Sequence, residues 1–186
     1  MKIIEPSATL IDTVDAADIY AKLERCGRIS HLSEPKDAEE FVRKIIRLGH
    51  ESVLEHVSLT FHIICDRAIQ NELVRHRHAS STVESTRYCA YDELSFVDPH
   101  MEDAALELIE AEYRERLLHG EPPEIAREML PLCLKSELYM TANLREWRYI
   151  LRLRTSSKAH PQMRFIMRQV LDTFRVNLPV IVEDIS

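Results

Sequence analysis

The segment from Arg75 to Tyr88, "RHRHASSTVESTRY", concentrates side chains that bind anions. It contains three arginines, two histidines and five hydroxyl residues before the tyrosine, and Glu84 is its one acidic residue. Guanidinium groups present forked N–H donors that match phosphate oxygens, and hydroxyl groups add further donors. Arg75 and Arg77 project in different directions whether the backbone is helical or extended, which suits a diphosphate or two separate phosphates. The residues therefore favour a phosphate site over a solvated surface loop.

Ser85, near the end of this segment, is a candidate nucleophile if a base lies within hydrogen-bonding reach. His76 and His78 are the local candidates for that base, but the spacing does not show such a contact. A nucleophilic serine is therefore the weaker interpretation of the segment.

The segment "GHESVLEH" brings together His50, Glu51, Glu55 and His56, which resemble metal ligands. A zinc site of the HExxH type needs two histidines four residues apart on one helical turn. Here the histidines are six residues apart, across an expected change from helix to strand. We therefore expect no metal ion, and interpret these polar residues as a solvated loop at a helix end.

A second basic segment runs from residue 145 to 175, where eight basic residues stand against two acidic ones. Arg148 and Arg152 are four residues apart and share a helix face, Arg154 ends that helix, and His160 begins the next. Cations near a helix C-terminus also interact favourably with the helix dipole, which is the purely structural explanation. Because the whole chain has a net charge of −7, we expect a small anionic ligand rather than a nucleic acid.

The composition indicates a single globular domain covering residues 1–186. No apolar run reaches the length needed to span a bilayer, and the first residues lack the apolar core of a signal peptide. We therefore expect a soluble cytoplasmic protein. Its four cysteines show no CxxC pairing and are expected to be reduced thiols that mainly pack: Cys26, Cys65, Cys89 and Cys133.

The elements around the Arg75 segment follow from periodicity. "SEPKDAEEFVRKIIRLGH" predicts a helix with Ser33 and Pro35 as start signals and Gly49 as its stop. "HVSLTFHIIC" alternates apolar and polar residues, as a half-buried strand does. Asp66 can cap the next helix, "RAIQNELVRHR", so the segment that begins at Arg75 starts at the C-terminal end of this helix and continues into a loop or short strand.

The second half of the chain is expected to be mainly helical. "MEDAALELIEAEYRERLLHG" predicts a helix closed by Gly120, and "PPEIAREML" begins another. "LKSELYMTAN" is compatible with a helix or a strand. Asn143 can cap "LREWRYILRLR", and Pro161 begins a final amphipathic helix. The pattern predicts an α+β fold, a compact domain with several helices around a small mixed sheet.

Four segments in a fixed order resemble the flavin-dependent thymidylate synthases. Arg75, His76, Arg77, seven further residues and Ser85 form the pattern RHR-x7-S. "GHESVLEHVSLTFHI" precedes it, and "IAREMLPLCL" and then "TANLREWRYILRLR" with "HPQ" follow it. The four segments extend from about His50 to Gln162, which makes a chance match improbable.

The resemblance implies a homotetramer with FAD at subunit interfaces and dUMP close to the flavin ring. The reaction would be reductive methylation of dUMP to dTMP, with methylenetetrahydrofolate as carbon donor and NADPH as reductant through FAD. The implied FAD contacts are His50, Ser52, Arg75, His76, Arg77, Glu137, Leu138, Tyr139, Asn143 and His160. The implied dUMP contacts are Glu72, Arg75, Glu84, Ser85, Thr86, Arg87, Arg127 and Arg154.

Two of these residues are implied to act in catalysis. Arg154, placed near the N3 and O2 edge of the uracil, would stabilise the deprotonated ring without a protein nucleophile. Ser85 would position dUMP. Loss of all turnover in Ser85→Ala with dUMP and FAD binding retained would reopen the nucleophile hypothesis.

The chain departs from the family pattern at three places. Thr82 and Val83 stand where many members have Asn-Glu or Ser-Gln, and Glu72 stands where many have glutamine. A carboxylate facing the dUMP phosphate would repel it, so Glu72 is expected to point elsewhere or to pair with an arginine. The segment between Arg154 and His160 is two residues longer than in some members.

Two other classes of function remain as alternatives. One is a non-enzymatic module that binds nucleotides, phosphate or RNA, although only Tyr88 and Tyr91 offer aromatic surfaces for stacking near the arginines. The other is a metal-dependent hydrolase built on the "GHESVLEH" segment, which metal analysis would distinguish.

Overall fold

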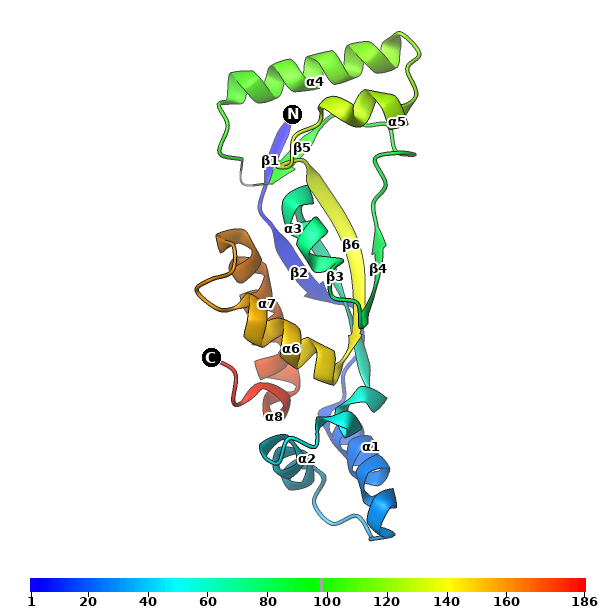
Figure 1. The fold of residues 1–186 in the computed structure, drawn as a ribbon, viewed down its shortest axis with the longest axis vertical. Helices are drawn as coiled ribbons and strands as arrows, with labels where there is room; N and C mark the ends of the chain where they lie inside the picture. The colour runs from blue at the N-terminus through cyan, green and yellow to red at the C-terminus, as the bar shows by residue number, and fades with distance from the viewer. Residues whose placement is uncertain (98) are drawn as a thin grey trace.

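A four-stranded antiparallel sheet occupies the middle of the computed structural model, which describes residues 1–97 and 99–186 (Figure 1). Its strand order is β2 (Ser7–Leu10), β3 (Ser58–Asp66), β6 (Lys135–Asn143) and β4 (Ala79–Val83). A separate parallel pair consists of β1 (Lys2–Ile4) and β5 (Ser95–Val97). The predicted α+β class, with several helices around small sheets, is confirmed.

The strands β3 and β6 pair along their whole length, from Ser58 opposite Asn143 to Asp66 opposite Lys135. The alternation that predicted β3 is observed, since Phe61 and Ile63 are fully buried while His62 lies on the open face. The segment that was compatible with helix or strand forms β6. Its polar residues alternate with buried ones, and β3 and β4 on its two sides satisfy its backbone hydrogen bonds.

Helices α6 (Leu144–Arg154), α7 (Pro161–Asn177) and α8 (Pro179–Val182) lie on one side of this sheet (Figure 1). Trp147 of α6 is fully buried, its ring centroid is 5.0 Å from that of Phe61, and its indole N–H donates to the Leu59 carbonyl at 2.9 Å. Burying such a side chain stabilises the fold by about 2–3 kcal/mol. This contact fixes α6, and therefore Arg154 at its end, against the sheet.

At one end of the molecule, α1 (Ala16–Arg28) and α2 (Ala38–Arg47) pack together (Figure 1). The N-cap of α2 is Asp37, whose side chain accepts from the Glu40 N–H, rather than the expected Ser33 or Pro35. Gly49 ends the helix as predicted, with a φ of 73° and the paired bonds of a Schellman motif. The short 3-10 helices η1 (Ile29–His31) and η2 (Glu51–His56) follow α1 and α2.

The helix α3 (Arg67–Leu73) is capped by Asp66, whose carboxylate accepts from the Ile69 N–H at 2.7 Å. The helix ends at Leu73 with Val74 as its C-cap, so it is shorter than the predicted helix from Arg67 to Arg77, and Arg75 to His78 form the link to β4. The buried Gln162 side chain donates to the Asp66 carboxylate at 3.1 Å and accepts from the Asp66 N–H at 3.0 Å. The starts of α3 and α7 are thereby held together.

A second, smaller core lies at the other end of the molecule, beneath α4 (Asp103–Leu118), α5 (Pro123–Ala126) and η3 (Arg127–Met129) (Figure 1). Phe96 of β5 and Tyr113 of α4 are fully buried in it. The Glu110 carboxylate accepts from the Leu94 N–H at 2.8 Å, which ties α4 to the strand region. Within the described residues, no helix combines the length and apolar composition that crossing a membrane requires.

Candidate functional site

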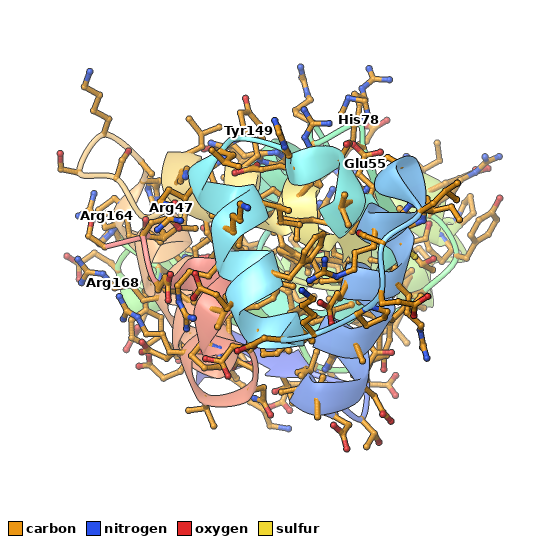
Figure 2. The ribbon with its side chains drawn as sticks, turned by 90° about the horizontal axis from the view of Figure 1, so that it is seen from below. Arg47, Glu55, His78, Tyr149, Arg164 and Arg168 are labelled. Atoms are coloured by element: carbon orange, nitrogen blue, oxygen red, sulfur yellow. The ribbon has the colours of Figure 1, made fainter. Side chains whose placement is uncertain are left out.

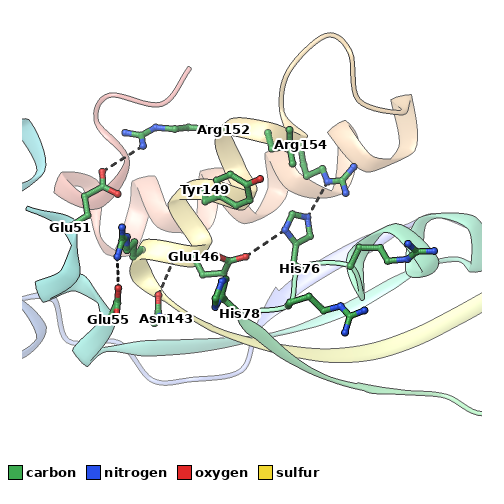
Figure 3. A pocket seen from close by; sticks show the side chains of 13 residues that line it. Glu51, Glu55, His76, His78, Asn143, Glu146, Tyr149, Arg152 and Arg154 are labelled. Carbon is green, nitrogen blue, oxygen red and sulfur yellow. Dashed lines mark hydrogen bonds and ion pairs between the residues drawn. The ribbon is translucent and has the colours of Figure 1, made fainter. Parts of the chain in front are cut away.

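A cavity of about 900 Å³ opens between η2, the link that follows α3, and α6 (Figure 3). We call it the main cavity. The link that follows α3, the start of α6 and the last turn of α6 supply most of its lining. The lining residues are Glu51, Glu55, Arg75, His76, Arg77, His78, Asn143, Arg145, Glu146, Tyr149, Arg152, Leu153 and Arg154.

The main cavity is basic, with five arginines against three glutamates. Arg145 pairs with Glu55 at 2.6 Å on its rim. Arg75 and Arg77 are exposed, and neither has a carboxylate within ion-pairing distance among the described residues. Two unpaired guanidinium groups in one cavity provide the forked donors that a phosphate-containing ligand needs.

Arg154 is held by its neighbours and is only 17% exposed. Its Nη1 lies 2.5 Å from a carboxylate oxygen of Glu72, and its Nε donates to His76 Nε2 at 3.1 Å. The expectation that Glu72 points elsewhere or pairs with an arginine is therefore met by an ion pair. The carboxylate neutralises Arg154 within the chain itself.

His76 is the most buried histidine of the segment, with 6% of its surface exposed. Burial lowers its pKa to about 4, and the nearby Arg154 guanidinium acts in the same direction. Its Nδ1 faces the Glu146 carboxylate at 3.6 Å (Figure 3). A neutral imidazole between an arginine and a carboxylate is thus a fixed part of the cavity wall.

The basic segment predicted from residues 145 to 175 does not form one surface. Arg148 is fully buried and bonds to Glu51 and Asp184, so it stabilises the fold and lies outside the cavity lining. Arg164 and Arg168 of α7 lie apart from the side on which Glu55, His78 and Tyr149 gather (Figure 2). Of the basic residues of this segment that the structure describes, Arg145, Arg152 and Arg154 line the main cavity.

A second cavity of about 270 Å³ contains two of the predicted dUMP contacts, Thr86 and Arg127. We call it the Thr86 cavity. Arg127 Nη1 donates to the buried Thr86 hydroxyl at 3.2 Å, and Arg87 pairs nearby with Glu124 at 2.8 Å. No residue lines both this cavity and the main cavity. Arg67 at the start of α3 lines the Thr86 cavity.

Ser85 and Glu84 follow β4 and belong to the same region. The Glu84 carboxylate pairs with Lys135 at 2.9 Å, and the Ser85 hydroxyl oxygen accepts from the Arg87 N–H at 3.3 Å. Among the described residues, neither His76 nor His78 hydrogen-bonds to the Ser85 hydroxyl, and the two ring nitrogens of His76 face Arg154 and Glu146. The geometry therefore offers no support for a nucleophilic serine.

His50 and Ser52 line a third cavity, of about 710 Å³, between α1, α2 and η2. The Schellman motif at the end of α2 places His50, whose N–H donates to the Ile45 carbonyl at 2.8 Å. The predicted FAD contacts are thus divided within one chain, since Arg75, His76, Arg77 and Asn143 line the main cavity instead.

The three predicted contacts on β6 differ in their surroundings. Leu138 is 1% exposed and packs in the core, because alternation along a strand sends it to the face opposite Glu137 and Tyr139. Glu137 bonds to His62 at 2.7 Å and to Lys135 at 2.6 Å, and Tyr139 stacks on His62. The Leu138 side chain is therefore a core residue, and the FAD contacts of all three residues stay predictions.

His160 is exposed and lines none of the three cavities described above. Its Nδ1 accepts from the Gln162 N–H at 3.3 Å, which caps α7. Among the described residues, no group of three or more histidine, cysteine, aspartate or glutamate side chains is arranged to share a metal ion. Glu51 and Glu55 instead pair with arginines.

Four residues of the main cavity were not proposed as site residues from the sequence: Arg145, Glu146, Tyr149 and Leu153. The first three lie on the first two turns of α6, whose start is fixed by Asn143 accepting from the Glu146 N–H at 2.9 Å. The sequence identified Asn143 as both a helix cap and a cofactor contact. Side chains on the first turns of the helix that it caps lie near the cap residue, so the helical periodicity would have placed them near the same cavity.

Comparison with known proteins identifies the family. The family model for thymidylate synthase complementing protein matches residues 9–180. A probable flavin-dependent thymidylate synthase of Mycobacterium phage D29 is 34% identical over 203 residues, covering 94% of this chain and 86% of that protein. The flavin-dependent thymidylate synthase of Thermococcus kodakarensis is 32% identical over 198 residues, covering 95% and 79%.

The fold is also found in a solved structure, that of the UMP/dUMP methylase PolB from Streptomyces cacaoi bound with 5-Br UMP. The TM-score is 0.84 at 24% sequence identity, over 98% of this chain and 95% of that chain. The family match over most of the chain, with Arg75, His76 and Arg77 of the RHR-x7-S pattern lining the main cavity, leads to one conclusion: this chain belongs to the thymidylate synthase complementing protein family, whose relatives include the flavin-dependent thymidylate synthases.

Proposed function

We propose that this protein is a flavin-dependent thymidylate synthase. It methylates dUMP reductively to dTMP, with methylenetetrahydrofolate as carbon donor and NADPH as reductant through FAD. The observation that carries the proposal is the presence of two unpaired arginines, Arg75 and Arg77, beside the held Arg154 in one cavity. Family membership and relatives named for this activity support it.

The main cavity has the size and the donors that FAD needs. About 900 Å³ is near the upper end of the range for small-molecule sites. Arg75 and Arg77 would hold the diphosphate, and the exposed side chains of Tyr149 and Leu153 offer apolar surface for a planar ring. Bound FAD would supply the hydride chemistry, and the protein would orient the nucleotide beside it.

Arg154 would supply the electrostatic contribution. Its guanidinium is mostly shielded from water, where a fixed positive charge stabilises developing negative charge more than it does in bulk solvent. Against the uracil N3 and O2 edge, it would favour the deprotonated ring. The contact of its Nε with His76 would keep the guanidinium in place during the reaction.

We also infer that the complete site needs more than one chain. The residues assigned to dUMP divide between the main cavity, with Arg154, and the Thr86 cavity, with Arg127. These cavities lie at different ends of α3, and Figure 1 shows α5 and α6 well separated along the molecule. A homotetramer would allow one chain to present its Thr86 cavity to the main cavity of another.

The test is the visible absorption spectrum of the purified protein, recorded after reconstitution with FAD, after dUMP and after NADPH in the absence of oxygen. A flavin spectrum that responds to dUMP and bleaches with NADPH, followed by dTMP formation on adding methylenetetrahydrofolate, is the expected result. A protein that binds dUMP but not FAD would instead be a nucleotide-binding module. UMP assayed beside dUMP would show whether the ribonucleotide is also a substrate.

A further inference from the structure

Three side chains form a line along the wall of the main cavity: Glu146, His76 and Arg154 (Figure 3). Glu146 Oε1 lies 3.6 Å from His76 Nδ1, and Arg154 Nε lies 3.1 Å from His76 Nε2. His76 and Glu146 are almost completely buried, with 6% and 9% of their surfaces exposed. The imidazole therefore connects the carboxylate to the guanidinium in an enclosed part of the wall.

The chemistry of arginine fixes the protonation of this imidazole. Arg154 Nε carries a hydrogen and can only donate, so His76 Nε2 must accept. The single ring proton then resides on Nδ1, the nitrogen that faces Glu146. A low pKa for His76, caused mainly by burial, is consistent with a neutral ring.

The position of Glu146 has a simpler explanation that the structure does not support. It is the third residue of α6 after the cap Asn143, where a glutamate side chain often accepts from the backbone N–H of the cap residue in a capping box. The Asn143 backbone instead belongs to the β3–β6 ladder, opposite Ser58, and the Glu146 carboxylate turns to His76. Within the described part of the chain, it has no arginine or lysine partner.

Burying a carboxylate without a cation is unfavourable, and burial raises the pKa of Glu146. An apolar residue in the same place would avoid that cost, so the stability of the fold alone does not account for Glu146. His78, from the link before β4, acts in the opposite direction and lowers the pKa of Glu146. The presence of a carboxylate at position 146 is therefore best explained by its contact with His76 Nδ1.

We propose that Glu146 is a positioning residue, which holds His76 in the Nδ1–H tautomer and thereby keeps His76 Nε2 free to accept from Arg154. Without an acceptor at Glu146, the ring can carry its proton on Nε2. In that tautomer the Nε2–H of His76 faces the Nε–H of Arg154, and two donors repel each other. The guanidinium would then turn away from His76, while Glu72 still holds its Nη1. The role in catalysis rests on the proposed function of Arg154.

The experiment compares the wild-type protein with Glu146→Gln and Glu146→Leu. Glutamine keeps an oxygen acceptor at nearly the same size, whereas leucine removes it. The proteins are labelled with ¹⁵N-histidine, and the His76 ring signals are assigned from their loss in His76→Gln. The NMR measurement needs neither cofactor nor substrate. Initial rates of dTMP formation are then measured for all three proteins after loading with FAD.

We expect the Nδ1–H tautomer in the wild type and in Glu146→Gln, and a shift towards Nε2–H in Glu146→Leu. We expect kcat to fall by about tenfold or more in Glu146→Leu, because small displacements of catalytic groups are costly, and Glu146→Gln to remain near the wild type. Unchanged tautomer or unchanged kcat in Glu146→Leu would overturn the proposal, and so would a glutamine variant as impaired as the leucine variant.

The two proposals fail separately. If the wild-type protein forms no dTMP, the proposed function fails and the catalytic part of this inference fails with it, while the tautomer measurement still decides the contact. If the wild type is active and the leucine variant equally active, the positioning role alone is wrong. Circular dichroism of both variants checks that the fold is retained.

Discussion

The Glu72 carboxylate lies 2.5 Å from Arg154 Nη1, so the chain supplies its own anion to the guanidinium that is assigned to the nucleotide. Glu72 is 42% exposed at its side chain, whereas Arg154 is 17% exposed. An incoming anionic ligand must share this guanidinium with Glu72 or displace it. The Glu72 carboxylate therefore opposes the binding of an anionic ligand at the position where the Arg154 guanidinium favours it.

Replacing this carboxylate should strengthen nucleotide binding. We expect Glu72→Gln to lower the dissociation constant for dUMP by about 3-fold to 10-fold, since a like charge next to a bound anion is unfavourable. Isothermal titration of the FAD-loaded protein measures it. Asp172→Asn is the matched control, because it removes one negative charge from a surface pair with Arg175, remote from the cavity. Equal binding of dUMP by Glu72→Gln and the wild type would contradict the expected repulsion. Weaker binding would show that Glu72 assists the ligand.

Replacing Arg148 should destabilise the whole fold. Its guanidinium is fully buried and bonds to Glu51, to Asp184 and to the Ile181 carbonyl. Removing one partner of a buried ion pair leaves the other charges uncompensated, at a cost of about 3–5 kcal/mol. Urea unfolding of Arg148→Ala at neutral pH measures this loss. In the control Arg145→Ala, an exposed pair with Glu55 is lost, and a change of about 0–1 kcal/mol is expected.

His76 should make stability dependent on pH in a defined window. Its pKa is 6.5 in the unfolded chain and about 4 in the folded one, so between these values the unfolded chain binds the additional proton. Stability should therefore fall as the pH falls from 6.5 towards 4, by up to about 1.4 kcal/mol per pH unit from this residue. His76→Gln should show a smaller slope in this window. Parallel curves for the two proteins would contradict the lowered pKa.

The contact between Gln162 and Asp66 should contribute strongly to stability because it is buried. In Gln162→Ala, the Asp66 N–H loses its acceptor and the Asp66 carboxylate loses one of its donors. Leaving buried polar groups unpaired costs about 1–3 kcal/mol each. Thermal or urea unfolding measures it, with Gln169→Ala on the same helix as control, since Gln169 makes only partly buried hydrogen bonds. Equal losses in the two variants would contradict this explanation.

The local structure around Arg75 could be predicted because local signals agree there. Asp66 as cap, the alternation of β3 and the stop at Gly49 each follow from neighbouring residues alone. Whether residues 135–143 form a strand depended on β3 and β4, which are distant in the sequence and come together only in the fold. The first strands and α1 had no comparable motif to identify them.

The candidate site was predictable in its residue types and only partly in its arrangement. Arg75, His76, Arg77, Asn143 and Arg154, which the sequence assigned to FAD or dUMP, line one cavity. Arg148 could not be separated from Arg152 by spacing, because both pair with Asp184 from the far end of the chain and only the tertiary packing buries Arg148. His50 and Ser52 line one further cavity, and Thr86 and Arg127 line another. This division depends on the tertiary structure and could not be predicted from local sequence patterns.

The segment from Thr155 to Ala159 connects two helices that are anchored independently of it. Trp147 fixes α6 against the sheet, and Gln162 fixes the start of α7 to Asp66. Extending such a connection by one or two residues adds only a small entropic cost and moves neither helix. The greater length of this connection relative to some family members is therefore structurally tolerable, and it is a suitable place to insert a reporter peptide or a fluorophore attachment site close to Arg154 without rebuilding the core.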